Sequence, residues 1–148
     1  MSVTPYEVAE AIRPDMTNLY VTYFRLSEVA DLTGPQLTIL SRLDKHGPAR
    51  VSEIAASEGI QMPTASNAIH HLDERNMVRR ERDPDDRRGI FVSITEFGRA
   101  TVRRVGEQRT RQLAEMLSVL NEEELRVCAK MVPVIHKLAQ HYRPEQRH

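Results

Sequence analysis

Residues 51–94 decide the fold, and they read VSEIAASEGIQMPTASNAIHHLDERNMVRRERDPDDRRGIFVSI. The first part of this stretch predicts two short helices joined by a turn. We expect Ser52 to cap the first helix and Gly59 to end it, because glycine readily adopts the left-handed backbone of a helix end. Pro63 suits the first turn of the second helix, which Asn76 ends. Apolar residues at helical spacing form its inner face: Ala65, Ile69 and Leu72. The pattern predicts a helix-turn-helix.

A charged β-hairpin is predicted directly after these two helices. Residues 78–82 and 90–94 have the composition of strands, and in the second Ile90, Val92 and Ile94 alternate onto one face. The segment between them, Asp83-Pro84-Asp85-Asp86-Arg87-Arg88-Gly89, consists of charged and turn-forming residues. It does not match a calcium loop, because an arginine follows the aspartates and the closing glutamate is missing. Arginines crowd into residues 79–88: Arg79, Arg80, Arg82, Arg87 and Arg88.

Longer helices are predicted on both sides of this stretch. Residues 6–30 carry apolar side chains at steps of three and four, and so does the last part of the chain. Pro14 lies either in the first turn of a helix that begins near residue 13 or at a kink in a longer helix. Pro133 should kink the last helix. The apolar stripes of the first and last helices are wider than a small winged helix can cover, which favours pairing with a second subunit.

Three further helix starts carry capping residues. Thr33 and Gln36 form the pattern of a capping box, and the helix that they start ends at the Gly-Pro pair 47–48. Thr95 is expected to cap a long helix that runs to about residue 120. Asn121 and Glu124 form the same pattern at the start of the last helix. The predicted order is therefore two helices, the helix-turn-helix, the hairpin and two long helices.

The charge of the chain sums to zero but is unevenly placed. The 148 residues carry 21 basic and 21 acidic side chains, so the global basic excess of many nucleic-acid-binding proteins is absent. Residues 1–49 have a net charge of −2, whereas residues 50–111 have a net charge of +2. Arginine supplies 18 of the basic residues, and its planar fork of donors suits phosphates and guanine edges. The basic segment coincides with the helix-turn-helix and the hairpin.

Length and the remaining composition indicate one domain with appended helices in the cytoplasm. A chain of 148 residues can bury a core without disulfides or a structural metal. The single cysteine, Cys128, excludes an internal disulfide. No apolar run approaches the roughly 20 residues that span a membrane. The N-terminus lacks the basic and apolar stretches of a signal peptide. We therefore expect a cytoplasmic protein without a membrane partner.

Six short motifs stand in the order of a known family. They are Leu32-Thr33-x-x-Gln36, Gly47-Pro48, Ser52-Glu53-Ile54-Ala55, Met77-Val78-x-Arg80, Asp83-Pro84-x-Asp86-Arg87-Arg88 and Ile94-Thr95-Glu96-x-Gly98-Arg99. With them the chain resembles the MarR family of winged-helix transcription regulators. The resemblance implies a mainly α fold with a small β-hairpin, called the wing. It also implies a DNA-binding lobe over residues 33–111 and dimerisation helices over residues 1–32 and 112–148.

The resemblance further implies a function. A homodimer would bind a pseudo-palindromic operator in double-stranded DNA and act as a repressor whose DNA affinity a small-molecule effector modulates. The effector would lie between the dimerisation helices and the DNA-binding lobe. Neither a cofactor nor an enzymatic activity is implied, and the sequence contains no nucleophile–base pair, paired carboxylates or glycine-rich phosphate loop.

The second helix of the helix-turn-helix supplies the first candidate DNA contacts. A helix from about residue 62 to residue 75 fits the major groove, where its N-terminal part meets base edges. Asn67 can pair with adenine, although many family members carry arginine there, which leaves the base preference open. Hydroxyl groups near a helix start can bind phosphates. The candidates on this helix are Thr64, Ser66, Asn67, His70 and His71.

The loop of the hairpin supplies the remaining candidates. Arg87 or Arg88 can enter the minor groove, where a narrow A·T stretch attracts arginine. Asp86 would repel a phosphate if it were free, and the family resemblance implies that it pins the neighbouring arginine by a salt bridge. Of the two arginines, Arg88 matches the wing arginine of the family best.

Two alternative functions remain open at this point. Cys128 could serve as the sensor of a redox-responsive regulator, but its place in an apolar stripe favours a buried, inert thiol. A winged helix can also bind another protein, which requires an apolar outer face on the second helix. A metal site is not expected, because His70 and His71 are adjacent on a helix and should point apart, and His136 and His141 are poorly spaced to share an ion.

Overall fold

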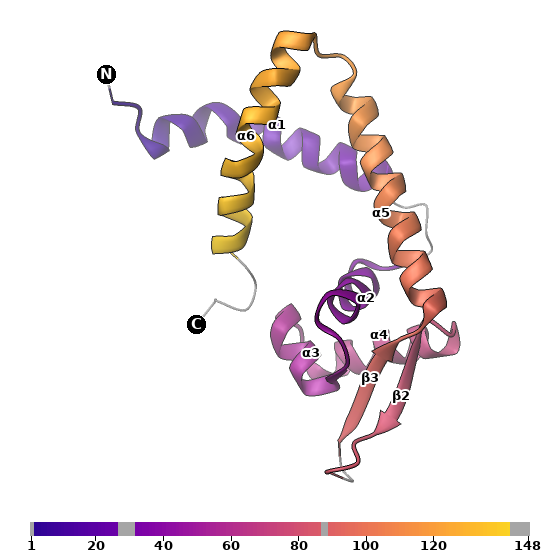
Figure 1. The fold of residues 1–148 in the computed structure, drawn as a ribbon. Helices are drawn as coiled ribbons and strands as arrows, with labels where there is room; N and C mark the ends of the chain where they lie inside the picture. The colour runs from indigo at the N-terminus through magenta and orange to yellow at the C-terminus, as the bar shows by residue number, and fades with distance from the viewer. Residues whose placement is uncertain (1, 27–31, 87–88, 143–148) are drawn as a thin grey trace.

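The structure, a computed structural model, describes residues 2–26, 32–86 and 89–142. These residues form a mainly α-helical fold with a small antiparallel sheet (Figure 1). The helices are α1 (Pro5–Leu26), α2 (Gly34–His46), α3 (Val51–Glu58), α4 (Met62–Glu74), α5 (Glu96–Leu117) and α6 (Glu122–His141). The strands are β1 (Ala49–Arg50), β2 (Val78–Arg82) and β3 (Ile90–Ile94). The predicted fold class is confirmed, and both hairpin strands have the predicted bounds.

The core lies between α2, α3, α4 and the sheet. In the sheet, β3 is central and pairs antiparallel with β1 on one side and β2 on the other. The hairpin register places Val78 opposite Ile94 and Arg82 opposite Ile90. Buried side chains from all of these elements form one cluster, which includes Ile39, Leu40, Leu43, Ile54, Ile69, Leu72, Met77, Val78 and Val92. The predicted inner face of α4 is therefore confirmed.

Most of the predicted helix starts are confirmed. Thr33 forms a capping box with Gln36, Asn121 forms one with Glu124, and the Thr95 hydroxyl accepts a hydrogen bond from a backbone N–H in the first turn of α5. Gly47 and Gly59 follow α2 and α3 with positive φ angles, and a proline lies in the first turn of α4.

Two details of the prediction were wrong, the cap of α3 and the end of α5. Ser52 does not cap α3: the helix begins at Val51, so the capping position falls two residues earlier, at Arg50. The helix after Thr95 ends at Leu117 instead of near residue 120. Of the two alternatives for Pro14, the longer helix is the one observed, because α1 begins at Pro5 and contains Pro14 in its interior.

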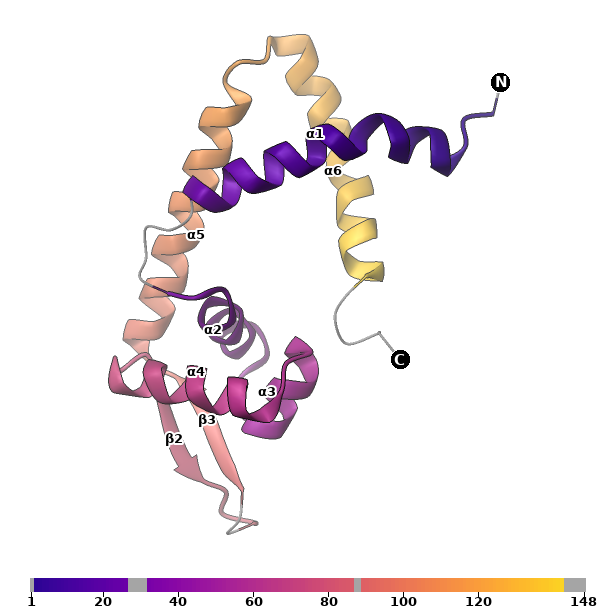
Figure 2. The same ribbon diagram turned by 180° about the vertical axis from the view of Figure 1, so that it is seen from behind.

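Figures 1 and 2 show the lobe with the hairpin at one end of α5, and α1 and α6 at the other end. These outer helices leave large apolar side chains uncovered in the single chain, and α6 contains no buried residue. On α1 the exposed apolar residues include Val8, Ile12, Met16, Leu19 and Tyr20, and on α6 they include Leu125, Met131, Val132, Ile135 and Leu138. The expectation of wide apolar stripes is confirmed.

The start of α5 packs against the connection between α4 and β2. The Thr95 hydroxyl donates to the carbonyl of Asn76 at 2.7 Å, and the Thr95 backbone N–H donates to the carbonyl of Met77 at 3.0 Å. Asn76 adopts a φ angle of 58°, a left-handed conformation that asparagine tolerates better than most residues. One turn into α5, a Cβ atom added to Gly98 would lie 2.2 Å from the Met77 carbonyl oxygen. Only glycine therefore fits at this contact.

We predict that Gly98→Ala destabilises the protein by about 1–3 kcal/mol, because α5 must move away from the Met77 backbone. Gly106→Ala on the same helix is the matched control, since a Cβ atom there meets nothing within 4 Å. The control should stabilise the protein by roughly 0.5–1 kcal/mol, the usual effect of replacing glycine in a helix. Urea unfolding measures both effects, and equal stability changes would contradict the proposed close approach.

Candidate nucleic-acid interface

Helix α4 has one buried face and one polar exposed face. Ala65, Ile69 and Leu72 point into the core. The opposite face is polar, and every candidate that the sequence predicted on this helix is exposed: Thr64, Ser66, Asn67, His70 and His71. Met62, at the start of the helix, is the large apolar side chain exposed on α4. This face suits a polar partner better than the apolar surface that a protein-binding module requires.

His70 and His71 converge on the same carboxylate. His70 Nε2 lies 3.2 Å from one oxygen of Glu74, and His71 Nδ1 lies 3.5 Å from the other. The expectation that the two rings point apart was wrong, because residues three and four positions before Glu74 both reach its side chain. Within the described residues, no group of three or more histidine, cysteine or acidic side chains is arranged to hold a metal ion.

The hairpin projects from the lobe on the side away from α1 and α6 (Figures 1 and 2). Its exposed arginines on β2 include Arg79, Arg80 and Arg82. Arg80 Nη2 lies 2.9 Å from Asp73 Oδ2, so one of these arginines is paired with the end of α4. The predicted contacts Arg87 and Arg88 lie outside the described residues. Asp86 is exposed. The arginines with which it was predicted to pair, Arg87 and Arg88, are the ones outside the described residues, so this pairing stays a prediction.

An ion pair between a partly exposed arginine and a buried carboxylate connects the hairpin loop to the helix-turn-helix. Asp83, directly after β2, is only 4% exposed, and its Oδ2 binds Arg50 Nη2 at the start of α3. Asp83 Oδ1 also accepts the backbone N–H of Asp85 at 2.9 Å. Sequence reasoning placed Asp83 in the loop and in a family motif but gave it no partner, and it missed Arg50. An arginine directly before a helix start, where an acceptor side chain is usual, was the available signal.

Asp83 has a pKa below its ordinary value. The main cause is the hydrogen bond from the Asp85 backbone N–H, and the Arg50 guanidinium lowers the pKa further against the opposing effect of burial. Both interactions favour the carboxylate over the carboxylic acid. The pair therefore contributes stability in its ionised form.

We predict that Asp83→Asn destabilises the protein at neutral pH and that this difference depends on pH. A native pKa below the unfolded value of about 3.8 gives stability that is fully present above pH 3.8. That stability is lost as the pH falls through the lower native pKa. Urea midpoints of the wild type and the variant should therefore converge in acid. The control Asp85→Asn keeps the backbone donor, and a wild-type advantage that is unchanged in acid would contradict the assignment.

The cysteine of the chain lies on α6. Cys128 is half-buried in the single chain, so the expectation of a fully buried thiol is not met there. The reason is that α6 packs on little of its own chain and buries none of its residues. A role of Cys128 in redox sensing stays an untested alternative.

Comparison with known proteins agrees with this arrangement. The sequence model of the MarR family matches residues 32–90. The HTH-type transcriptional repressor MdtR of Bacillus subtilis is 34% identical over 113 residues, which cover 76% of this chain and 71% of that protein. The crystal structure of the YusO protein of Bacillus subtilis is 28% identical, with a TM-score of 0.74, over 93% of this chain and 99% of that one. A MarR family protein from Bacillus stearothermophilus is 22% identical, with a TM-score of 0.73, over 94% and 99%.

The fold and the exposed face of α4 define a winged helix-turn-helix regulator. The chain belongs to the MarR family, as the similarity to MdtR and the family match establish, and the resemblance seen in the sequence is confirmed. It is a DNA-binding transcription regulator and not an enzyme. No helix in the described ranges has the length and apolar character that crossing a bilayer requires.

Proposed function

We propose that this chain is a sequence-specific repressor that binds double-stranded DNA as a homodimer and responds to a small ligand. The observation that carries the proposal is the polar exposed face of α4 beside a hairpin that projects from the same side of the lobe. The name of MdtR, a transcriptional repressor, supports repression over activation. Such a regulator acts beside the chromosome, so the proposal includes a cytoplasmic location.

In the proposed complex, α4 lies in the major groove. Asn67 pairs with a base, adenine being the best geometric match for its amide. Thr64 and Ser66, in the first turns of the helix, bind phosphates or base edges. His70 and His71 lie one turn further along, and their rings, which both contact Glu74, approach the DNA on the same face of the helix.

The hairpin loop is the second proposed contact. Arg88, or its neighbour Arg87, enters the minor groove beside the major-groove site, and Asp86 orients the arginine. Arginine in a narrow minor groove reads the shape of A·T-rich DNA, so the loop adds to specificity without reading single bases.

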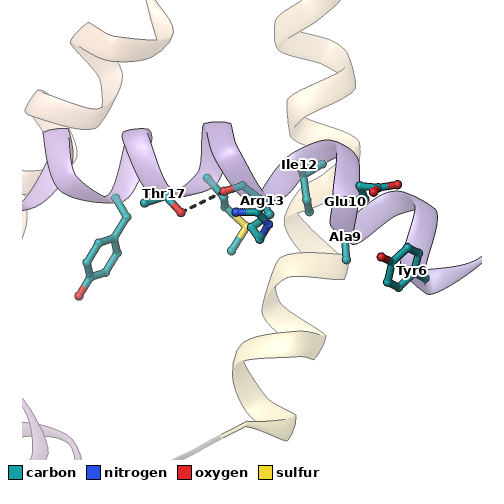
Figure 3. A pocket seen from close by; sticks show the side chains of 8 residues that line it. Tyr6, Ala9, Glu10, Ile12, Arg13 and Thr17 are labelled. Carbon is teal, nitrogen blue, oxygen red and sulfur yellow. Dashed lines mark hydrogen bonds between the residues drawn. The ribbon is translucent and has the colours of Figure 1, made fainter.

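Two copies are proposed to associate through α1 and α6. The exposed apolar side chains of these helices form faces that a single chain leaves in water at a high free-energy cost. Along α1 runs an open hollow of about 540 Å³ whose lining, including Tyr6, Ile12 and Met16, comes from that one helix (Figure 3). A second copy can supply its other wall. Residues 1–32 and 112–148 then dimerise, and residues 33–111 bind DNA.

The two-fold symmetry of such a dimer predicts a pseudo-palindromic operator with half-sites about one helical turn (~10 bp) apart. The effector is proposed to bind between the dimerisation helices and the DNA-binding lobe. There it would change the spacing of the two α4 helices and so the DNA affinity. Membership of the MarR family supports the proposal of an effector site between these two parts of the molecule.

We predict that Asn67→Ala and Arg88→Ala each weaken DNA binding about tenfold, while the dimer stays folded. The probe is a duplex selected by the wild-type chain from a random-sequence pool, and anisotropy titration gives the dissociation constant. Affinity should also fall steeply with salt, because phosphate neutralisation releases counterions. Lys137→Ala, on α6, is the control. Unchanged affinity of the Arg88 variant would remove the hairpin loop from the interface.

We predict that the wild-type chain sediments as a dimer of the 17.0 kDa subunit. Ile135→Glu places a charge in the apolar face of α6 and should yield a monomer with weaker operator binding. Lys137→Glu, on the opposite face of the same helix, should leave the dimer intact. A wild-type chain that sediments as a monomer at micromolar concentration would contradict the assembly.

A further inference from the structure

The Arg50 side chain makes no capping hydrogen bond with α3, the helix that begins directly after it. It ends β1 and stands at the capping position of α3 with φ −74° and ψ 152°. Capping residues normally accept a hydrogen bond from the helix start, and arginine has only donors. Glu53 serves this helix end instead, because its carboxylate accepts the backbone N–H of Arg50 at 3.2 Å. The guanidinium is therefore available for a distant partner.

The Arg50 side chain reaches across the central strand of the sheet. Strands β1 and β2 lie on opposite sides of β3, and Arg50 stands opposite Phe91 in the register. The guanidinium carbon lies 5.7 Å from the centre of the Phe91 ring, within the range of a cation–π contact. Beyond it the guanidinium meets Asp83, a residue 33 positions away that directly follows β2. One side chain thus connects all three strands.

Asp83 in turn organises the loop of the hairpin. Its backbone N–H donates to the carbonyl of Gly89 at 2.9 Å, and its Oδ1 accepts the N–H of Asp85. A Cβ atom on Gly89 would lie 3.3 Å from that of Asp83, so the two ends of the loop pack tightly. One carboxylate oxygen therefore faces the loop, and the other faces the helix-turn-helix.

A second ion pair on the hairpin offers a comparison. Arg80 on β2 pairs with Asp73 at the end of α4, and both side chains are more than a third exposed. In the other pair the Arg50 side chain is 38% exposed, whereas the Asp83 side chain is only 2% exposed, so the two pairs differ in the burial of the carboxylate. Exposed pairs contribute little, whereas removal of Arg50 would leave the buried Asp83 carboxylate without a compensating charge. Of these two connections, the Arg50–Asp83 pair is the one that should control where the loop lies.

We propose that Arg50 and Asp83 are positioning residues for DNA recognition, because their ion pair sets the place of the hairpin loop relative to α4. The proposal rests on the proposed function, in which α4 and the hairpin contact one duplex together. Simultaneous contact at two grooves requires a defined distance between the two elements, and a displacement of about 1 Å is enough to lose a well-placed contact. Neither residue needs to touch the DNA.

The test compares four single variants and the Arg50→Met/Asp83→Asn double variant on the duplex selected by the wild-type chain from a random-sequence pool. Arg50→Met keeps the length of the side chain and removes the guanidinium, and Arg50→Lys keeps a charge. Asp83→Asn removes the carboxylate charge at nearly constant volume. Asp73→Asn is the matched control, because it breaks the exposed pair of the same hairpin. Far-UV circular dichroism and thermal melting establish a temperature at which all variants are folded.

We expect Arg50→Met and Asp83→Asn each to weaken binding by about tenfold or more, and the double variant to be no weaker than either single variant. Arg50→Lys should restore part of the affinity, and Asp73→Asn should change it less than about threefold. At saturating protein, hydroxyl-radical footprints of the two weakened variants should lose protection at the outer ends of the site and keep it at the centre. A purely structural role would weaken the whole footprint evenly.

Three results would overturn the proposal. Arg50→Met alone could weaken binding while Asp83→Asn does not, which would make Arg50 a direct DNA contact. Asp73→Asn could weaken binding as much as Asp83→Asn, or the footprint of the weakened variants could fade uniformly. Failure of the proposed function is seen separately, because Asn67→Ala would then leave the affinity of the otherwise wild-type chain unchanged. If Asp83→Asn does not fold, the variants Arg50→Met and Arg50→Lys still decide the question. They show whether affinity is lost without the guanidinium, whether lysine restores part of it, and which part of the footprint changes.

Discussion

The backbone contact between α5 and the α4–β2 connection is the constraint on which the arrangement of the molecule depends. Thr95 binds the carbonyls of both Asn76 and Met77, and Gly98 leaves the space that this approach requires. The contact joins the end of α4, the start of the hairpin and the start of α5. Because α5 also contacts α1, this one helix connects the outer part of the molecule to α4 and the hairpin.

The hairpin is held at both of its ends. At its base it is fixed by the α5 contact, and at its loop by the ion pair of Arg50 with Asp83. The exposed strand residues between these points carry arginines, of which Arg80 also pairs with α4. In the proposed complex this double attachment limits the positions of the hairpin relative to α4, so that geometry compensates for a chain without net positive charge.

Local patterns in the sequence were sufficient for most of the fold. Capping residues, glycines and apolar spacing depend on neighbours within one or two turns, which is why Thr33, Thr95 and Asn121 were assigned correctly. The short strand β1 was not predicted, because a two-residue strand exists only through its pairing with β3. Arg50 was missed for the same reason, since its partner lies 33 residues away. The exposure of the α4 candidates followed from helical spacing, whereas their contacts with DNA remain predictions.

The most direct test of the account is methylation interference on the duplex that the wild-type chain selects. Dimethyl sulfate marks guanine in the major groove and adenine in the minor groove, so one experiment reports both proposed contacts. The account predicts two symmetric patches of major-groove interference about one helical turn apart, each with minor-groove interference on its outer side. A single patch, or interference confined to one groove, would contradict a dimer that places α4 and the hairpin on the same DNA.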